Sequence, residues 1–232
     1  LENIKNKLLR KKSNVLIYEG FMYKYHSQIK KVLDLVNNNE IGEIEKIVSS
    51  FGVNLLTKKY FWIFKKKKKI DKESRLFNKK LGGGCILDLG CYPVSFITML
   101  LEKLNFINFE DYKVLNKKVE IGETGVDIDS KIEMKVNGKI TIKLSSSFKQ
   151  NIGFATKIHG SRGSIEIINT WTGSPSIILK KENNKNIIRF DQIDDIYFDQ
   201  LNIISNDLLN ESNGQNMDNM LLNMKIIEKW LN

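Results

Sequence analysis

The chain has 232 residues, of which 41% are apolar and 28% are charged, and its formal net charge is +10. This composition is too apolar for a disordered chain and too charged for a membrane bundle, so it indicates a globular protein. The length suits one large domain or two small ones. No uncharged apolar run of 18 residues is present, so the sequence predicts no membrane span.

The positive charge comes almost entirely from lysine, with 33 lysines against 4 arginines. Lysine, asparagine and isoleucine have AT-rich codons, and all three are abundant here. Two interpretations follow, an AT-rich genome or a polyanionic partner. Selection for phosphate recognition would favour the bidentate fork of arginine over lysine, so we favour the genomic interpretation.

Cys85 and Cys91 are the only cysteines. On a helix their spacing places them about 240° apart around the axis, so they do not face each other. A disulfide framework is excluded, and we expect a reduced, cytoplasmic setting. With only two distant histidines, His26 and His159, no metal site is predicted.

The first part of the chain alternates helical and apolar segments. Residues 2–12 are predicted to form a helix, and the continuous apolar run Val15–Tyr18 is typical of a buried parallel strand. A second helix is expected over His26–Asn37, and a strand over Ile44–Asn54. Residues 57–80, which include Lys65–Lys69, are expected to form an irregular, mobile, basic loop.

The second part changes from a helical period to a period of two. A largely buried helix is predicted over residues 85–104, and alternation begins with Ile128, Ser130, Ile132, Met134 and Val136. It resumes at Ile140, after an Asn137-Gly138 hairpin signal. A meander of further strands is expected near residues 154–159, 164–169, 176–181 and 186–190, followed by helices over 197–209 and 217–231.

The segment with chemical potential is Gly82-Gly83-Gly84 followed by Asp88, Tyr92 and Pro93. Consecutive glycines let the backbone approach a ligand closely. Asp88 and Tyr92 are four residues apart, so on a helix they project from one face and could hydrogen-bond hydroxyls and move a proton. Pro93 predicts a kink, or a helix that begins near residue 92.

Each of these features also has a purely structural interpretation. Glycine triplets are common in ordinary loops, and an aspartate in a first helical turn is favourable whatever the function. A tyrosine with a pKa near ~10 is a poor acid or base at neutral pH unless a cation stabilises the phenolate.

Ordered blocks of the sequence resemble the Gfo/Idh/MocA family of NAD(P)-dependent oxidoreductases. They are Glu19–Gln28, Ile41–Ile44, Gly82–Phe96, Ile158–Ile165 and Met217–Met220. The resemblance points to the glucose–fructose oxidoreductase and dihydrodiol dehydrogenase branch. It implies an α+β fold with an open, mainly antiparallel sheet and helices packed on one face, preceded by the last helix and strand of a Rossmann domain. The implied division is 1–20 for the Rossmann remnant and 21–232 for the C-terminal substrate and oligomerisation domain.

The resemblance also implies roles for individual residues. Tyr92 would exchange a proton with the substrate hydroxyl, and Asp88 would orient that hydroxyl. Substrate contacts are expected from Lys24, His26 and Gly84. Cofactor contacts are expected from Glu19 and Gly20. The implied reaction is hydride transfer between NAD or NADP and a hydroxyl-bearing carbon of a sugar or diol.

The sequence departs from the family pattern in ways that bear on activity. Neither the Gly-rich dinucleotide fingerprint nor the Glu-Lys-Pro motif, whose lysine would lower the phenol pKa, is present in these residues. Lys24 stands where many relatives have arginine, and Tyr92 stands where inositol dehydrogenase-type members have histidine. We therefore expect that these 232 residues alone do not turn over substrate and hold no nucleotide tightly.

Two other functions remain as alternatives. A non-catalytic interaction domain could form homo-oligomers through the open sheet face. A basic nucleic-acid-binding protein is less favoured, because no recognition motif accompanies the lysine run. The expected partners are a small sugar or diol substrate and a second copy of the chain, with no specific nucleic acid and no membrane.

Overall fold

The computed structural model describes residues 2–11, 15–60, 64–106, 108–182, 184–190, 197–210 and 216–232. Its helices are α1 (Glu2–Lys11), α2 (Ser27–Asn37), α3 (Cys91–Glu102), α4 (Phe198–Leu209) and α5 (Met217–Leu231). Short 3-10 turns are η1 (Met22–Tyr25), η2 (Arg75–Phe77), η3 (Lys79–Leu81) and η5 (Phe109–Asp111), and η4 (Ile86–Gly90) is a π-helical turn. The strands are β1 (Ile44–Gly52), β2 (Thr57–Tyr60), β3 (Phe64–Lys67), β4 (Tyr112–Ile121), β5 (Asp127–Val136), β6 (Ile140–Ser147), β7 (Thr156–Gly160), β8 (Gly163–Ile167), β9 (Ser176–Lys181) and β10 (Asn184–Arg189).

Eight of these strands form one open sheet in the order β10-β9-β8-β7-β1-β6-β5-β4. Strand β1 lies in the middle, parallel to β6 and antiparallel to β7. Every other neighbouring pair is antiparallel. The mainly antiparallel open sheet predicted from the family resemblance is therefore confirmed.

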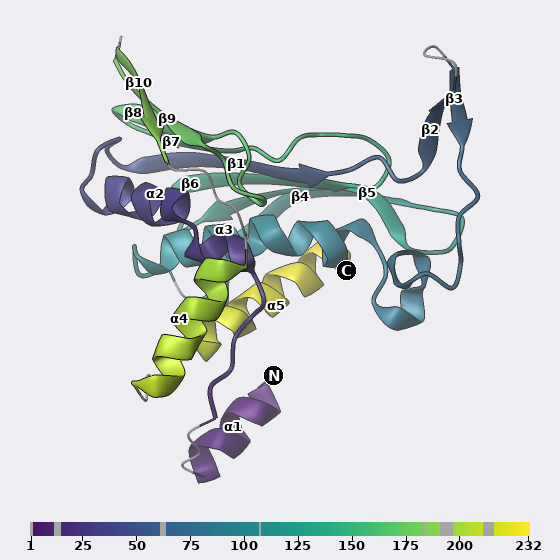
Figure 1. Cartoon of the computed structure of the whole chain (residues 1–232), viewed down its shortest axis with the longest axis horizontal. Coiled ribbons are helices and arrows are strands. Elements are labelled where there is room, and N and C mark those ends of the chain that lie inside the picture. Colours follow the sequence, from purple (N-terminus) through teal and green to yellow (C-terminus); the bar gives the residue numbers. More distant parts are fainter. Residues whose placement is uncertain are drawn as a thin grey trace.

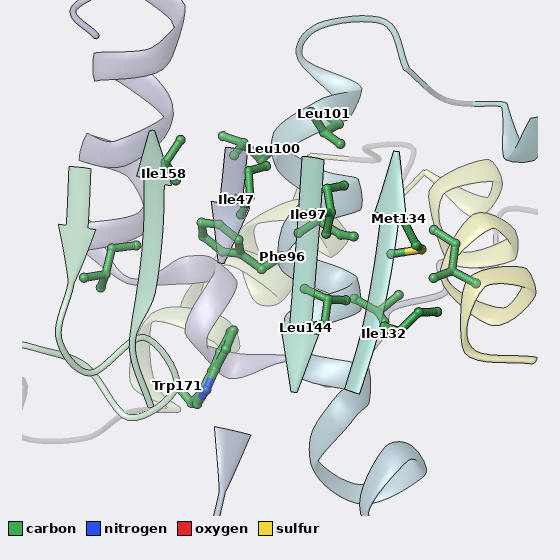
Figure 2. Packing of buried hydrophobic residues seen from close by; sticks show 14 of the residues in the cluster. Ile47, Phe96, Ile97, Leu100, Leu101, Ile132, Met134, Leu144, Ile158 and Trp171 are labelled. Carbon is green, nitrogen blue, oxygen red and sulfur yellow. The ribbon is translucent and has the colours of Figure 1, made fainter. Parts of the chain in front are cut away.

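Helices α2, α3 and α5 lie along one face of this sheet (Figure 1). The core forms where α3 meets the strands, and Figure 2 shows Phe96, Ile97, Leu100 and Leu101 of α3 facing the apolar side chains of the strands. All four are completely buried. The helix thus contributes its most apolar stripe to the sheet, which is the main hydrophobic stabilisation of the domain.

The period-two pattern correctly predicts the covered face of the sheet. On β5 the alternating residues Ile128, Ser130, Ile132, Met134 and Val136 are all buried, and lysines and acids stand between them. Because successive side chains of a strand point to opposite faces, this alternation orients β5 with its apolar side toward α3 and α5.

The predicted β5–β6 hairpin is also confirmed. Asn137 has φ 46° and Gly138 has φ 67°, and the Lys139 amide donates to the Val136 carbonyl at 3.0 Å. Two positive φ angles in a tight turn give a twist that matches the flanking strands, and Asn-Gly adopts this conformation readily.

Two expectations differ from the structure. Residues 15–20 are extended, but Val15–Tyr18 pairs with no described strand, and the side chain of Val15 is 60% exposed. The expected buried parallel strand is therefore wrong for this structure, because a strand needs a hydrogen-bonding neighbour on at least one side. Helix α1 does form, although its expected end at Lys12 lies outside the described residues.

Within the expected irregular loop 57–80, strands β2 and β3 form a separate two-stranded sheet. Neither alternative predicted at Pro93 describes the structure fully, since Cys85–Glu102 is one continuous helical run in which the π-helical turn η4 directly precedes α3. Pro93 lacks an amide proton, and irregular backbone bonding such as the preceding π-helical turn is a usual accompaniment of a proline within a helix. The division at residue 20 stays a prediction.

The segment Lys79–Glu102 has the length and composition of a membrane-spanning helix. In the structure 72% of its most apolar window is buried within the fold, so its hydropathy is explained by its place under the sheet.

Candidate functional site

The glycine triplet positions the start of the buried helix. Gly82 adopts φ 74° and ends η3, and Gly84 has φ 121°. The Asp127 carboxylate of β5 lies directly against the α-carbon of Gly84, where a β-carbon would overlap Oδ1. Its Oδ2 accepts the Ile86 amide at 2.7 Å. Asp127 therefore caps η4 from the sheet, and only glycine at position 84 leaves room for it.

Tyr92 stands at the first turn of α3 within a cluster of aromatic rings. Its ring meets Phe21 and Phe51 edge-on, each at 5.2 Å between centroids, and lies 5.9 Å from Trp171 and 6.0 Å from Tyr23. The phenol is only partly buried, and its hydroxyl faces Met22 Sδ at 4.0 Å. Such packing fixes the ring, and within the described part of the chain the hydroxyl's contact is the weak acceptor Met22 Sδ.

Burial raises the pKa of Tyr92 to about 12, with smaller contributions from the negative forms of Cys91, Tyr197 and Asp88. The phenol is therefore protonated at neutral pH. It can donate a hydrogen bond, whereas proton transfer in either direction requires a nearby cation to stabilise the phenolate.

Asp88 lies in the π-helical turn, one turn before Tyr92. Its Oδ1 pairs with the guanidinium of Arg75 from η2. Asp88 contributes to the raised pKa of Tyr92, so the two groups share one electrostatic environment, although no hydrogen bond joins them among the described contacts. Asp88 and Tyr92, which the sequence predicts as a pair, therefore lie near each other, but the carboxylate of Asp88 pairs with Arg75 and not with Tyr92.

Lys24 and Glu19 form a largely enclosed ion pair at 3.1 Å, with side chains 11% and 20% exposed. The Lys24 ammonium also lies 4.9 Å from the centroid of the Phe21 ring. Asn223 of α5 donates to both Glu19 oxygens, at 3.1 and 2.8 Å, and accepts from Thr98. This network joins the Glu19–Gln28 segment to α3 and α5 beneath the aromatic cluster.

The other predicted site residues occupy different surroundings. His26 is completely buried at the start of α2, so a substrate would reach it only if the side chain were uncovered. Gly20 is exposed, and nothing lies within 4 Å of the place where a β-carbon would stand. The roles predicted for His26, Gly20, Glu19, Lys24 and Gly84 stay predictions.

Three residues of this region were missed by the sequence interpretation: Arg75, Asp127 and Asn223. Arg75 had a usable signal, because an arginine is rare in a chain with 33 lysines and 4 arginines. Asp127 and Asn223 had none, because their partners at Ile86 and Glu19 lie 41 and 204 residues away.

Among the described residues, no three histidine, cysteine, aspartate or glutamate side chains converge as a metal-binding group. This region contains a positioned phenol, the two ion pairs Lys24–Glu19 and Arg75–Asp88, and a cluster of aromatic rings.

The fold is an α+β domain with a mainly antiparallel open sheet that helices cover on one face. A model of the GFO/IDH/MocA C-terminal domain matches residues 29–166. The chain therefore belongs to the Gfo/Idh/MocA family, as its resemblance indicated.

Curated relatives agree with this assignment. The chain is 29% identical over 175 residues to trans-1,2-dihydrobenzene-1,2-diol dehydrogenase of Xenopus tropicalis, covering 75% of this chain and 47% of that protein. It is 27% identical over 165 residues to dTDP-3,4-didehydro-2,6-dideoxy-alpha-D-glucose 3-reductase of Saccharopolyspora spinosa, covering 71% and 43%. The chain thus spans less than half the length of these relatives.

Solved structures show the same fold at low sequence identity. A 3-ketoreductase from Actinomadura kijaniata in complex with NADP and TDP-benzene has a TM-score of 0.76 at 16% identity, covering 96% of this chain and 64% of that one. An aldose-aldose oxidoreductase from Caulobacter crescentus complexed with glycerol also has a TM-score of 0.76 at 16% identity, covering 94% and 62%.

Proposed function

We propose that this chain is the substrate side of an NAD(P)-dependent oxidoreductase that acts on a hydroxyl-bearing carbon of a sugar or diol. The observation that carries the proposal is Tyr92, a partly exposed phenol fixed by an aromatic cluster at the start of the central helix. The names of the relatives support the substrate class, since they include a diol dehydrogenase and a sugar 3-reductase.

The raised pKa of Tyr92 determines the protonation state in which it meets a substrate. At neutral pH the phenol carries its proton, so it donates to a carbonyl oxygen and passes the proton on as that oxygen becomes a hydroxyl. Asp88, held by Arg75, accepts a hydrogen bond from a hydroxyl of the same substrate. Because proton donation leaves a phenolate, proton transfer by Tyr92 in either direction depends on a cation that lowers the phenol pKa.

The described residues do not make a nucleotide cradle of their own. The chain contains no Gly-rich fingerprint, and the carboxylate of Glu19 is already bonded to Lys24 and Asn223. When bound, NAD(P) supplies or accepts the hydride. We infer that the 232 residues alone neither turn over substrate nor hold the nucleotide tightly.

Three further parts of the proposal concern the context of the protein. Residues 1–20 belong to a dinucleotide-binding domain, residues 21–232 form the substrate domain, and the protein works in the cytoplasm. It forms homo-oligomers through the uncovered sheet face. That face carries the ion pairs Lys143–Glu133 and Lys157–Glu166, so the contact would be polar. Light scattering at tens of micromolar tests this, and a clean monomer contradicts it.

The decisive experiment replaces Tyr92 by phenylalanine in the complete gene product. The ring packing is kept and only the hydroxyl is lost, so kcat for NAD(P)H-dependent reduction of a keto sugar should fall about 10²-fold or more. Tyr23→Phe is the matched control, because the Tyr23 hydroxyl is buried against Ser95 at 2.5 Å. Y23F should stay within about threefold of the parent.

If Y92F also stays within about threefold, Tyr92 is not the proton donor and the proposal fails. A second measurement addresses the chain by itself. Calorimetry with NADH should detect no binding to the 232 residues up to millimolar concentration, and micromolar binding would contradict the inferred dependence on further residues.

A further inference from the structure

The short turn η2 lies directly against the glycine triplet, and this contact gives Arg75 a fixed place. The Gly84 amide donates to the Leu76 carbonyl at 3.0 Å. A β-carbon on Gly83 would lie 2.7 Å from the Arg75 carbonyl oxygen and 2.8 Å from that of Leu76. Real β-carbons do not come this close to backbone atoms, so glycine at position 83 lets the two segments approach each other.

The other side of the turn is anchored in the core. Phe77, two residues after Arg75, is buried, and its ring meets that of the completely buried Phe148 with 5.6 Å between centroids. Backbone hydrogen bonds on one side and ring packing on the other therefore hold the backbone at Arg75 in place. The direction of its side chain is then set by the groups within reach.

The Arg75 side chain reaches the carboxylate that stands one turn before Tyr92. Its Nη2 donates to Asp88 Oδ1. The Asp88 side chain is 19% exposed, whereas that of Arg75 is 59% exposed, so the carboxylate is largely enclosed and most of the guanidinium is accessible. An ion pair with one partner this exposed contributes little to stability, so stability alone does not explain why the turn is held here.

This ion pair leaves a donor and an acceptor side by side. A guanidinium carries five N–H donors, and among the described contacts it donates to Asp88 Oδ1 alone. The second carboxylate oxygen, Oδ2, accepts no hydrogen bond from the described residues. A hydroxyl group donates and accepts through one oxygen atom, so a single hydroxyl can donate to Asp88 and accept from Arg75. Both of these bonds involve a charged partner and are stronger than neutral ones.

The position of the pair relative to Tyr92 indicates which hydroxyl it binds. Asp88 lies in η4, one turn before Tyr92, and it acts on the electrostatic environment of the phenol. If Tyr92 contacts the oxygen on the reacting carbon, the ion pair is placed to contact an oxygen on a neighbouring carbon.

We propose that Arg75 is a specificity-determining residue, whose guanidinium binds, together with the carboxylate of Asp88, a hydroxyl on the carbon next to the reacting one. The substrate class is then an α-hydroxy ketone in reduction and a vicinal diol in oxidation. This role rests on the proposed function, in which Asp88 alone contacts the substrate hydroxyl. Arg75 adds a bond to the hydroxyl oxygen that a carboxylate, which only accepts, cannot make.

Reduction of three matched ketones by the complete gene product tests the proposal. The probes are 2-hydroxycyclohexanone, 2-methoxycyclohexanone and 2-ethylcyclohexanone. The methoxy oxygen accepts from Arg75 but cannot donate to Asp88, and the ethyl group has the same shape with no acceptor. The comparison of these two ketones therefore isolates Arg75 from any effect that it has through Asp88. Rates expressed relative to the parent enzyme remove the intrinsic reactivity of each ketone.

The variant Arg75→Gln should lower kcat/KM about tenfold or more for the hydroxy and methoxy ketones, and less than about threefold for the ethyl ketone. The loss should lie mainly in KM, because the bond already exists before the reaction. R75K keeps the positive charge but not the planar fork, so it should retain part of the preference.

Arg189→Gln is the matched control, because Arg189 is an exposed arginine on β10, at the sheet edge opposite β4. It should change kcat/KM for all three ketones less than about twofold. Equal melting temperatures of R75Q and R189Q exclude unfolding as the cause. If R75Q lowers kcat/KM equally for the methoxy and ethyl ketones, the proposal is overturned and the proposed function stands.

A binding measurement without turnover separates the two hypotheses. In saturation-transfer NMR titrations, R75Q should weaken binding of 2-methoxycyclohexanol about tenfold and leave that of 2-ethylcyclohexanol unchanged. If the complete protein reduces none of the ketones but shows this difference, the proposed function fails and the Arg75 contact holds. If R75Q affects both alcohols equally, the contact is overturned whatever the outcome of the kinetics.

Discussion

Replacing Gly84 by alanine tests why the glycine triplet is where it is. A β-carbon there would overlap Asp127 Oδ1 and lie 2.8 Å from its Cγ, and the backbone φ of 121° is one that side chains rarely adopt. The carboxylate must move away, and it then loses the bond from the buried Ile86 amide, now 2.7 Å long.

The structure allows the magnitude to be worked out. Strain at a sparsely populated φ costs about 1–3 kcal/mol, and a hydrogen bond to a charged group contributes about 1.5–3 kcal/mol. Gly84→Ala should therefore lower the free energy of unfolding by about 2.5–6 kcal/mol, and Asp127→Ala by about 1.5–3 kcal/mol. In the double variant the bond is lost only once, so the two effects should fall short of additivity by about 1.5–3 kcal/mol.

Urea unfolding followed by circular dichroism measures all three free energies. Gly138→Ala serves as the control, because Gly138 also has a positive φ of 67° but no atom within 4 Å of its β-carbon position. Its effect should add to that of Asp127→Ala within about 0.5 kcal/mol. If the effects of Gly84→Ala and Asp127→Ala add as fully as those of the control pair, the need for glycine at position 84 does not come from the Asp127 carboxylate. The predicted substrate contact of Gly84 then becomes the better explanation.

Three further predictions concern the interior. Burial raises the pKa of Cys91 to about 12 and that of Cys85 further still. Neither thiol of the folded protein should therefore react with a disulfide reagent at pH 8, whereas both should react after unfolding in urea. Because the unfolded thiols lose their protons first, unfolding free energy should decline from about pH 9 toward pH 12, and a flat profile would contradict the burial. Gly90→Ala should cost about 1–2 kcal/mol in urea unfolding, since its β-carbon would lie 3.0 Å from Trp230 Cζ3 and helix propensity recovers only part of the overpacking. Asn223→Ala should lower the free energy of unfolding by about 1.5–3 kcal/mol in the same assay, because the hydrogen bonds to the Glu19 carboxylate are lost. A decrease below about 0.5 kcal/mol would show that this network does not stabilise the fold.

Local patterns predicted most of the fold. The alternation on β5, the Asn137-Gly138 turn and the apolar stripe of α3 each depend on residues a few positions apart, and each matches the structure. The apolar run Val15–Tyr18 predicted a strand that does not form, because strand formation depends on a neighbouring strand and not on the run itself.

The lysine segment shows the opposite error. A run of like charges argued against regular structure, but the residues before and after the apolar stretch pair as β2 and β3. Charge patterning alone therefore underestimated the order of this segment.

The candidate site was predicted only in part for the same reason. Tyr92 and Asp88 were visible as neighbours on one helical turn, and the family resemblance supplied their roles. Arg75, Asp127 and Asn223 reach them or their segment through contacts between distant parts of the chain. Such contacts have no local signature in a single sequence.

The central place of β1 has a consequence for synthesis on the ribosome. Ile44–Gly52 is the first strand of the large sheet to be made, yet its neighbours are Ile140–Ser147 and Thr156–Gly160. Synthesis proceeds at about 5–20 residues per second, so both edges of β1 stay unpaired for roughly 5–20 s before either partner strand has been made. The adjacent charges of Glu45 and Lys46 then act as gatekeepers that discourage pairing with other nascent chains. The strands on either side of β1, β4–β6 and β7–β10, can pair with their neighbours as they are made. The sheet is complete only when both groups have paired with β1.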